Sequence, residues 1–226
     1  MDSTEHNQDL ICDEHLKAFE ELGFFVLDNF LPQEVANMLL EKFESYKCWN
    51  QVEQTREHYK KGGPFHCDSP LLPDESELYY NRTERTALLD KDPQWADIFK
   101  EYFVNRFESA FKCKITEPYI LLQKYGKGSF SRIHTDDYRG EVRHVDIGFI
   151  YYLNRRWVWD WGGLLIICPD NKCEDMAAVV PKHNRISIVN HQKRPPHAVT
   201  PVTDWAKEVR YGLTGFIGCD QRLYKG

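Results

Sequence analysis

The period of the hydrophobic pattern changes near Lys114, and this change constrains the fold more than any other feature of the sequence. Before it, apolar residues recur at the three- to four-residue spacing of amphipathic helices, and after it they follow the two-residue period of strands. Short strand-like runs separated by turn residues then occupy 119–125, 130–134, 142–153, 164–168, 177–180, 186–189, 198–202 and 209–217. So many short strands in one half of the chain predict a β-sandwich or a β-barrel.

The N-terminal half predicts helices that brace this sheet, so the expected fold class is α+β. Helices are expected at 15–22, from Pro32 onward and at 95–111, with Gly23 placed to end the first. A short buried strand is expected at 24–27. Residues 50–78 lack a period and contain Gly62-Gly63-Pro64, which predicts a long loop of the kind that often serves as a lid.

Length and composition narrow the possible functions. The 226 residues suit one domain, with 1–114 as mainly helical support and loop and 115–220 as the β core. A formal net charge of −6 does not favour a broad nucleic-acid surface. The sequence contains no apolar run near the ~18 residues that span a bilayer, so no membrane partner is expected. The sequence does not indicate an oligomeric state.

The cysteines and the first residues predict a cytoplasmic protein with reduced thiols. The chain begins with an acidic, polar stretch, unlike a signal peptide. Its seven cysteines are odd in number and form no C-x-x-C motif, so neither a disulfide framework nor paired zinc knuckles fits well. Cys168 and Cys173 are near enough in sequence to pair or to bind metal, but we expect two loop thiols.

His134-Thr135-Asp136 is the first chemical signal. In a strand, His134 and Asp136 point to the same face, where an imidazole and a carboxylate can bind one metal ion. The pattern alone is weak, because His144-Val145-Asp146 repeats it and a hydrogen-bonded strand histidine is the alternative. His197, just before the run at 198–202, supplies a candidate third ligand. Two histidines and one carboxylate make a facial triad, which suits Fe(II) and leaves coordination positions open.

Arg210 is the second signal, because it lies in the otherwise apolar run at 209–217. Such an arginine must find an anion or reach solvent, and its planar fork suits a carboxylate. Gly212 and Thr214 share its face, so the glycine leaves room and the threonine can add a hydroxyl. A surface arginine on an edge strand is the alternative.

The segment from about Tyr119 to Asp220 resembles the Fe(II)/2-oxoglutarate-dependent dioxygenases, and more closely their prolyl 4-hydroxylase-like branch. The motifs that carry the resemblance, in order, are Tyr125-Gly126-x-Gly128, His134-Thr135-Asp136, Ile150-Tyr151-Tyr152-Leu153-Asn154, Gly162-Gly163-Leu164, His197-x-Val199-x-x-Val202 and Arg210-Tyr211-x-Leu213-Thr214. Each is weak alone, but their order and spacing extend over nearly half the chain. The resemblance implies a double-stranded β-helix (jelly roll) core flanked by the N-terminal helices, in agreement with the strand pattern.

The resemblance also implies cofactors and site residues. The implied ligands of Fe(II) are His134, Asp136 and His197, and 2-oxoglutarate is the implied co-substrate, used with O2 and with ascorbate as a possible reductant. Arg210 would hold the distal carboxylate of 2-oxoglutarate, and Tyr152 would donate its hydroxyl to the same group. Tyr125 would contact co-substrate or substrate near the metal, and Thr214 would assist Arg210. Core packing with a satisfied hydroxyl is the alternative for both tyrosines.

The spacing of the motifs in the family argues against two other candidate ligands, the second His-x-Asp motif and His191. The family's His-x-Asp precedes the Tyr-Tyr-Leu-Asn strand by more than a dozen residues, which His134 satisfies and His144 does not. His144 and Asp146 are therefore expected to be strand residues, and His191 to lie in the loop before His197.

Two departures from the family pattern bear on the substrate. Asn190 stands where an apolar or aromatic residue is common. The aromatic segment 157–161 either walls the substrate pocket or plugs the end of the barrel.

The implied function is hydroxylation of an unactivated C–H bond, first of all on a prolyl residue of a protein or peptide. A free amino acid or another small metabolite is the alternative substrate. Two other classes remain open. A non-catalytic jelly-roll binding module would not need the triad and the arginine, and a cupin-type isomerase using zinc or another metal has no use for Arg210.

Overall fold

A computed structural model describes residues 10–47, 49–55, 79–86, 93–136, 145–170 and 173–220. The helical elements are α1 (Asp13–Glu21), α2 (Gln33–Ser45), α4 (Pro93–Phe99), the π-helical turn η2 (Lys100–Val104), α5 (Asn105–Phe111) and the 3-10 turn η3 (Trp159–Trp161). The strands are β1 (Phe24–Asp28), β2 (Asn50–Thr55), β3 (Tyr79–Thr86), β4 (Ile115–Tyr125), β5 (Phe130–His134), β6 (Ile147–Tyr152), β7 (Leu165–Ile167), β8 (Ala177–Val179), β9 (Arg185–Asn190), β10 (His197–Val199) and β11 (Arg210–Cys219).

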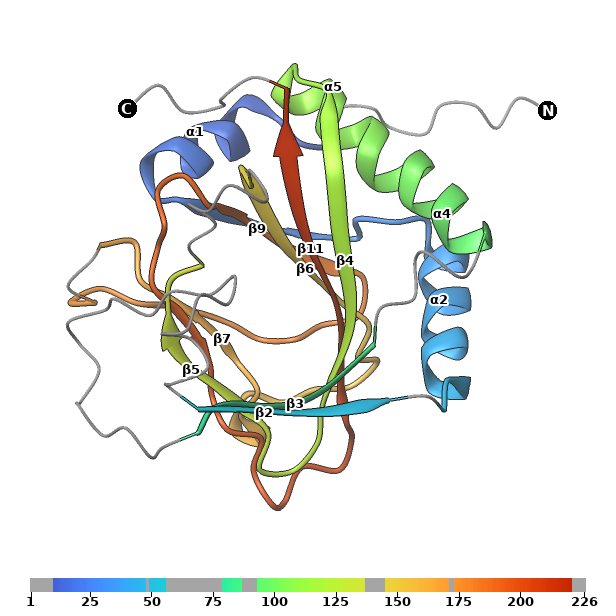
Figure 1. Cartoon of the computed structure of the whole chain (residues 1–226), viewed down its shortest axis with the longest axis vertical. Helices are drawn as coiled ribbons and strands as arrows, with labels where there is room; N and C mark the ends of the chain where they lie inside the picture. Colours follow the sequence, from blue (N-terminus) through green and yellow to red (C-terminus); the bar gives the residue numbers. More distant parts are fainter. Residues whose placement is uncertain are drawn as a thin grey trace.

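The strands form one antiparallel sheet that folds over on itself (Figure 1). Its order is β1-β9-β6-β11-β4-β3-β5-β10-β7-β8, with β2 added to β3. One layer consists of β1, β9, β6, β11 and β4, and the other consists of β5, β10, β7 and β8. Strand β3 joins the two layers by pairing with both β4 and β5. The arrangement confirms the predicted double-stranded β-helix core with N-terminal helices.

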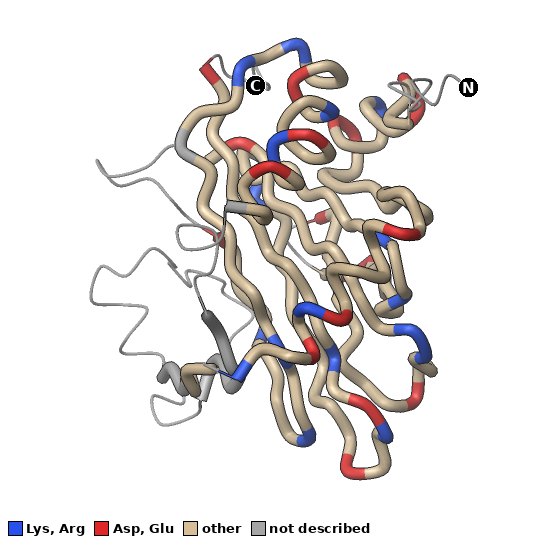
Figure 2. Tube along the Cα trace, turned by 90° about the vertical axis from the view of Figure 1, so that its right-hand side faces the viewer, with Lys and Arg blue, Asp and Glu red and all other residues tan. Residues whose placement is uncertain are grey.

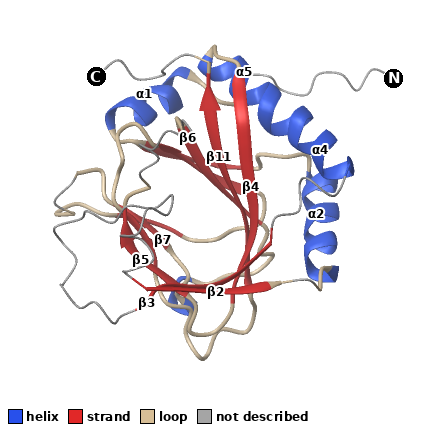
Figure 3. Cartoon of the chain, in the orientation of Figure 1, coloured by secondary structure: helices blue, strands red, loops and turns tan. Residues whose placement is uncertain are grey.

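The helices cover the outer face of the layer that contains β6 and β11 (Figure 3). Alternation along β6 explains this, because Phe149 points outward to the helices while Gly148 and Ile150 point into the space between the layers. The Phe149 ring lies 5.3 Å from Phe103 and 5.6 Å from Phe107. The aromatic face of the 93–111 helical segment thus fixes the wall behind the site.

Local signals place most element ends where the sequence predicts them. Gly23 follows α1 with φ +83°, a conformation that glycine adopts without strain. Pro32 immediately precedes α2. The helix expected at 95–111 is present from Pro93 to Phe111, and η2 forms a π-helical turn within it. The prediction from the hydrophobic period is therefore confirmed on both sides of Lys114.

The expectation of a loop over 50–78 was wrong at its start. Residues 50–55 form β2, which pairs with β3. Its sequence, NQVEQT, is mostly polar, so no apolar alternation marked it as a strand. Residues 56–78 lie outside the described residues. The strand expected at 142–153 is shorter, since β6 begins at Ile147 and residues 142–144 also lie outside the described part of the chain.

The expectation of two loop thiols was wrong for Cys168 and Cys173, which form a disulfide. Cys168 follows β7, and the chain turns back so that Cys173, with φ +53°, lies 4.9 Å from it between Cα atoms. That separation suits a disulfide. Sequence spacing could not reveal the turn, because it depends on the backbone conformation of Cys173.

Asp28 joins the edge strand β1 to the start of β9. Its carboxylate accepts hydrogen bonds from Arg185 Nε at 2.6 Å, Arg185 Nη2 at 3.1 Å and Lys182 Nζ at 2.7 Å. The hydrogen bond from Arg185 is the largest influence on the carboxyl, burial opposes it, and Lys182 reinforces it. Together they lower the pKa of Asp28 from 3.8 to about 2.

Replacing Asp28 with Asn should lower the free energy of unfolding by about 1 kcal/mol at pH 7. The pKa shift corresponds to roughly 2 kcal/mol, which solvent screening of this partly exposed side chain reduces by about half. Because the folded pKa is the lower one, this stabilisation exists above pH 4 and disappears as the pH falls toward 2. Urea unfolding of both proteins at several pH values measures it, and a difference that stays constant with pH would contradict the ionic origin.

Charged residues lie mainly on the helices and connecting segments, where both signs are interspersed (Figure 2). Within the described residues, no helix is long and apolar enough to cross a membrane. Among the described residues, the buried aspartate and arginine side chains are those of Asp136, Asp146 and Arg210.

Candidate metal centre

The structure brings together the three residues predicted as metal ligands. His134 ends β5, Asp136 follows two residues later, and His197 begins β10. Strands β5 and β10 pair antiparallel with His134 opposite His197, so the register places the two imidazoles side by side, 4.4 Å apart between ring centroids. One ligand atom from each of the three residues lies within 4.8 Å of the others.

The orientation of each imidazole is fixed by a main-chain carbonyl. His134 Nδ1 donates to Arg132 O at 2.6 Å, and His197 Nδ1 donates to Pro195 O at 3.0 Å. Since a carbonyl can only accept, the proton is on Nδ1 in both rings, and each Nε2 presents a lone pair to the centre. His134 Nε2 lies 3.6 Å from Asp136 Oδ1, and His197 Nε2 lies 3.4 Å from Oδ2.

The electrostatics of this cluster favour a cation. Burial opposes ionisation of Asp136, but the facing imidazoles of His197 and His134 outweigh it and hold the pKa of the carboxyl well below its usual range. Burial likewise opposes protonation of His197, yet the carboxylate of Asp136 raises the pKa of this ring above its ordinary value. A buried carboxylate that stays ionised and attracts positive charge is what a divalent cation requires.

The residues present fit Fe(II). Asp136 Oδ1 is buried and has no hydrogen-bond partner, so it is an orphaned acceptor that a cation would satisfy. Two imidazole nitrogens and one carboxylate oxygen form the donor set of non-haem Fe(II) oxygenases, in which the remaining coordination positions stay open.

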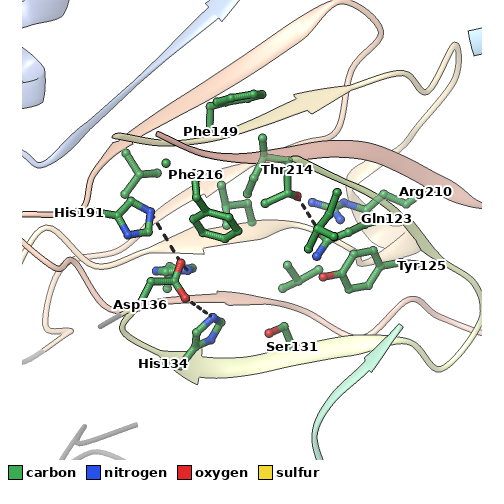
Figure 4. Close-up of a pocket in the computed structure, with 17 residues that line it drawn as sticks. Gln123, Tyr125, Ser131, His134, Asp136, Phe149, His191, Arg210, Thr214 and Phe216 are labelled. Carbon is green, nitrogen blue, oxygen red and sulfur yellow. Dashed lines mark hydrogen bonds and ion pairs between the residues drawn. The ribbon is translucent and has the colours of Figure 1, made fainter. Parts of the chain in front are cut away.

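Arg210 begins β11 and lies in the same cavity as the ligands (Figure 4). It is 1% exposed, and its Nε and Nη2 atoms have no hydrogen-bond partner. Its guanidinium lies 4.6 Å from the centroid of the Tyr125 ring and 5.2 Å from that of Tyr152. No carboxylate of the described residues forms an ion pair with it. The alternative of a surface arginine on an edge strand is wrong, because the side chain is buried and β11 lies between β6 and β4 in the sheet.

A carboxylate ligand would complete this arginine. A buried guanidinium without an anion is costly, and two unsatisfied N–H groups on one edge match the bidentate geometry of a carboxylate. The main chain leaves room for the side chain, since a Cβ on Gly163 would approach Arg210 Cδ to 3.1 Å. The Gly162-Gly163 motif therefore serves the packing of Arg210 as well as the turn.

The two predicted tyrosines lie beside Arg210, and Thr214 lies on the same strand, β11. Tyr125 lies opposite Arg210 across β4 and β11 and lines the cavity. Tyr152 is fully buried, and its hydroxyl lies 3.3 Å from Ser187 Oγ, so it has a protein partner at present. Thr214 lines the cavity, and its hydroxyl donates to Gln123 Oε1 at 2.8 Å. Their roles toward 2-oxoglutarate stay predictions.

Three polar residues that line the cavity were not singled out as site residues from the sequence, namely Gln123, Ser131 and His191. Gln123 precedes Tyr125 by two positions on β4, so strand alternation alone would have placed it on the same face. His191 lies 3.7 Å from Asp136 Oδ2, and burial lowers its pKa to about 4, which leaves the ring neutral at pH 7. The expectation that it lies in the segment between β9 and β10 is met, but that segment enters the site.

Asp146, of the second His-x-Asp motif, has a structural role. Its carboxylate accepts the main-chain N–H of Cys219 at 2.7 Å and a hydrogen bond from Gln192, and so secures the end of β11. It does not belong to the metal-binding group. His144 lies outside the described residues.

The aromatic segment 157–161 closes the end of the barrel near Arg210. Trp157 and Trp161 pack against a cluster formed by Tyr125, Val199, Val202 and Ala206. None of the tryptophans of this segment lines the cavity, among the described residues that do. The packing favours the plug over the pocket wall.

Known proteins that are similar to this chain are Fe(II)-dependent oxygenases, in agreement with the ligands found at this site. A family model described as "2OG-Fe(II) oxygenase superfamily" matches residues 120–218. The human prolyl hydroxylase EGLN3 is 25% identical over 198 residues, which cover 87% of this chain and 79% of that protein. Human Egl nine homolog 1 is 36% identical over 93 residues, which cover 37% of this chain and 21% of that protein. The rat protein of the same name matches equally well, and there the match covers 26% of the relative.

Solved structures show the same fold. A prolyl-4-hydroxylase from Pseudomonas putida superposes with a TM-score of 0.64 at 16% identity, covering 90% of this chain and 96% of that one. A prolyl hydroxylase from Trichoplax adhaerens, in complex with a hypoxia inducible factor peptide fragment, gives a TM-score of 0.61 at 18% identity and covers 90% and 86%. The match over 120–218 and the geometry of the site together support a 2-oxoglutarate-dependent dioxygenase that is similar to prolyl 4-hydroxylases and uses Fe(II), 2-oxoglutarate and O2.

Proposed function

We propose that this dioxygenase hydroxylates a prolyl residue in a protein or peptide. The observation that carries the proposal is the match to a prolyl hydroxylase over 87% of this chain, together with the family-model match over 120–218, which contains the His134/Asp136/His197 cluster and Arg210. The Trichoplax adhaerens structure, with its bound peptide fragment, supports a peptide over a small molecule as the substrate.

In this proposal the side chains of the cavity divide into two groups. The Nε2 atoms of His134 and His197 and the carboxylate of Asp136 hold Fe(II). When bound, Fe(II) with 2-oxoglutarate and O2 supplies the oxidation of a C–H bond, and 2-oxoglutarate leaves as succinate and CO2. Arg210, at the other end of the cavity, pairs with the distal carboxylate of 2-oxoglutarate and so orients the molecule toward the ligand cluster.

The cavity walls between these two groups are largely apolar. Leu121, Leu165, Val189, Val199 and Phe216 line it. Such walls exclude water, which strengthens the electrostatic contacts of Arg210 and Asp136 and limits side reactions. The rings of Tyr125 and Tyr152 lie against the guanidinium of Arg210. Its Nε and Nη2 atoms, which have no hydrogen-bond partner, therefore form the edge that binds the co-substrate.

Succinate formation should depend on a proline-containing peptide. Purified protein with Fe(II), ascorbate and 2-oxoglutarate is tested against a peptide library and, separately, against free proline and other amino acids. Mass spectrometry of the peptide should show one added oxygen atom on proline, and the same peptide with alanine in place of that proline should give only the slow turnover seen without substrate. Oxidation of free amino acids but of no peptide would overturn the proposed substrate and leave the dioxygenase chemistry intact.

A further inference from the structure

His191 is a third imidazole at the carboxylate of Asp136. Its Nε2 lies 3.7 Å from Asp136 Oδ2, and its ring also interacts with the Asp136 main chain. In Figure 4, His191 and His134 lie on opposite sides of Asp136. His191 lies outside the group of three residues whose ligand atoms converge. It therefore contacts a predicted ligand without being placed to bind the ion.

The fold leaves a niche for this ring. A Cβ on Gly148 would lie 1.9 Å from His191 Nε2 and 2.5 Å from its Cδ2, so any side chain in β6 at this position would expel the imidazole. The ring packs edge-on against Phe216, with centroids 5.5 Å apart. Absence of a side chain on one wall and an aromatic face on the other hold the ring in one orientation.

Asn190 builds the turn that delivers His191. Its side chain donates to Phe19 O and accepts the main-chain N–H groups of Gln192 at 3.1 Å and Lys193 at 3.3 Å. The main-chain N–H of His191 donates to Asp146 O at 3.0 Å. The polar residue at position 190, where the family pattern favours an apolar one, thus acts together with the histidine that follows it.

We propose that His191 is a positioning residue whose Nε2, 3.7 Å from Asp136 Oδ2, holds this oxygen by an electrostatic contact and leaves Oδ1 as the oxygen that binds Fe(II). Asp136 has two oxygens, and Oδ1 is the one without a hydrogen-bond partner. A carboxylate anchored through one oxygen cannot rotate, so it enters the coordination sphere through the other one already oriented. The inference rests on the dioxygenase assignment and is independent of the identity of the substrate.

The contribution of His191 should appear in metal affinity. Partners that orient a metal ligand commonly contribute 10- to 100-fold to affinity. Replacing His191 with Leu should therefore weaken Mn(II) binding, used as a redox-stable probe for Fe(II), by about 10- to 100-fold. His191→Gln retains an N–H donor near the position of Nε2 and should recover most of that affinity.

Two further variants separate positioning from packing. Gly148→Ala keeps His191 but fills its niche, and it should also weaken Mn(II) binding. His183→Leu is the control, because His183 is a half-buried histidine with two hydrogen bonds, to Leu153 O and Asn37 Oδ1, away from the cavity. It should leave Mn(II) affinity within about twofold of wild type, a change of less than about 0.5 kcal/mol.

The experiment is calorimetric titration of metal-free protein with Mn(II), together with the visible absorption spectrum of the Co(II)-loaded protein. Loss of the anchor should change the Co(II) spectrum in His191→Leu and much less in His191→Gln. Wild-type affinity in His191→Leu would overturn the inference, as would equal losses in the Leu and Gln variants when both melt like wild type. Normal Mn(II) and 2-oxoglutarate binding by a wild type that oxidises no peptide would count against the proposed substrate alone.

Discussion

Replacing His134 with Ala should abolish succinate formation from 2-oxoglutarate. The substitution removes one of the three converging ligand atoms and leaves Asp136 Oδ1 without the imidazole that faces it. The loss should exceed the roughly 100-fold that removal of a mere orienting partner causes. Succinate production with Fe(II), ascorbate and the best peptide measures it, and direct Mn(II) titration should show the same loss.

His183→Ala is the control for this experiment, since it removes a half-buried histidine that is hydrogen-bonded to Leu153 O and Asn37 Oδ1. It should retain turnover. Because the metal-free protein already lacks the ion, His134→Ala and wild type should melt at similar temperatures in the presence of a chelator. Persistent turnover in a folded His134→Ala protein would mean that the ligand set is different from the one predicted.

The ligand cluster could be predicted from the sequence because its geometry is mostly local. His134 and Asp136 are two residues apart, so their relative placement follows from strand alternation alone. His197 required one long-range pairing, β5 with β10, and the resemblance supplied that pairing through the order of the motifs. The strand core was predictable for a similar reason, because alternation of buried and exposed side chains is strong in its apolar strands.

The parts that escaped prediction depend on tertiary contacts with no local signal. The position of His191 depends on a missing side chain at Gly148 and on the turn that Asn190 organises, which are remote from Asp136 in sequence. The disulfide between Cys168 and Cys173 depends on a positive φ in a turn. Strand β2 is polar and owes its conformation to pairing with β3.

The buried arginine was predicted, but only the structure shows that it lacks an anion. Sequence pattern placed Arg210 in an apolar strand next to Gly212 and Thr214, and a salt bridge within the protein would have satisfied that pattern equally well. The structure instead leaves Nε and Nη2 unsatisfied. Stability and co-substrate binding are therefore coupled at this residue, and the coupling has a sign that can be measured.

Replacing Arg210 with Met should weaken 2-oxoglutarate binding by about 100- to 4000-fold and at the same time stabilise the ligand-free protein. Loss of one member of a buried charge pair costs about 3 to 5 kcal/mol, which sets the scale of the binding defect. In the ligand-free protein the same charge is buried with no carboxylate partner, so a methionine of similar length removes an unfavourable term. Calorimetric titration with 2-oxoglutarate and thermal melting in its absence give the two quantities.

The two effects must have opposite signs, and this distinguishes the proposed role from a packing role. If Arg210 only filled space, Arg210→Met would be neutral or destabilising and would leave 2-oxoglutarate affinity unchanged. Arg210→Lys keeps the charge but loses the planar fork, so it should bind 2-oxoglutarate more weakly than wild type without the gain in stability. Saturating 2-oxoglutarate should raise the melting temperature of the wild type and of Arg155→Met, an exposed-arginine control, but not that of Arg210→Met, because only a ligand that binds the folded state stabilises it.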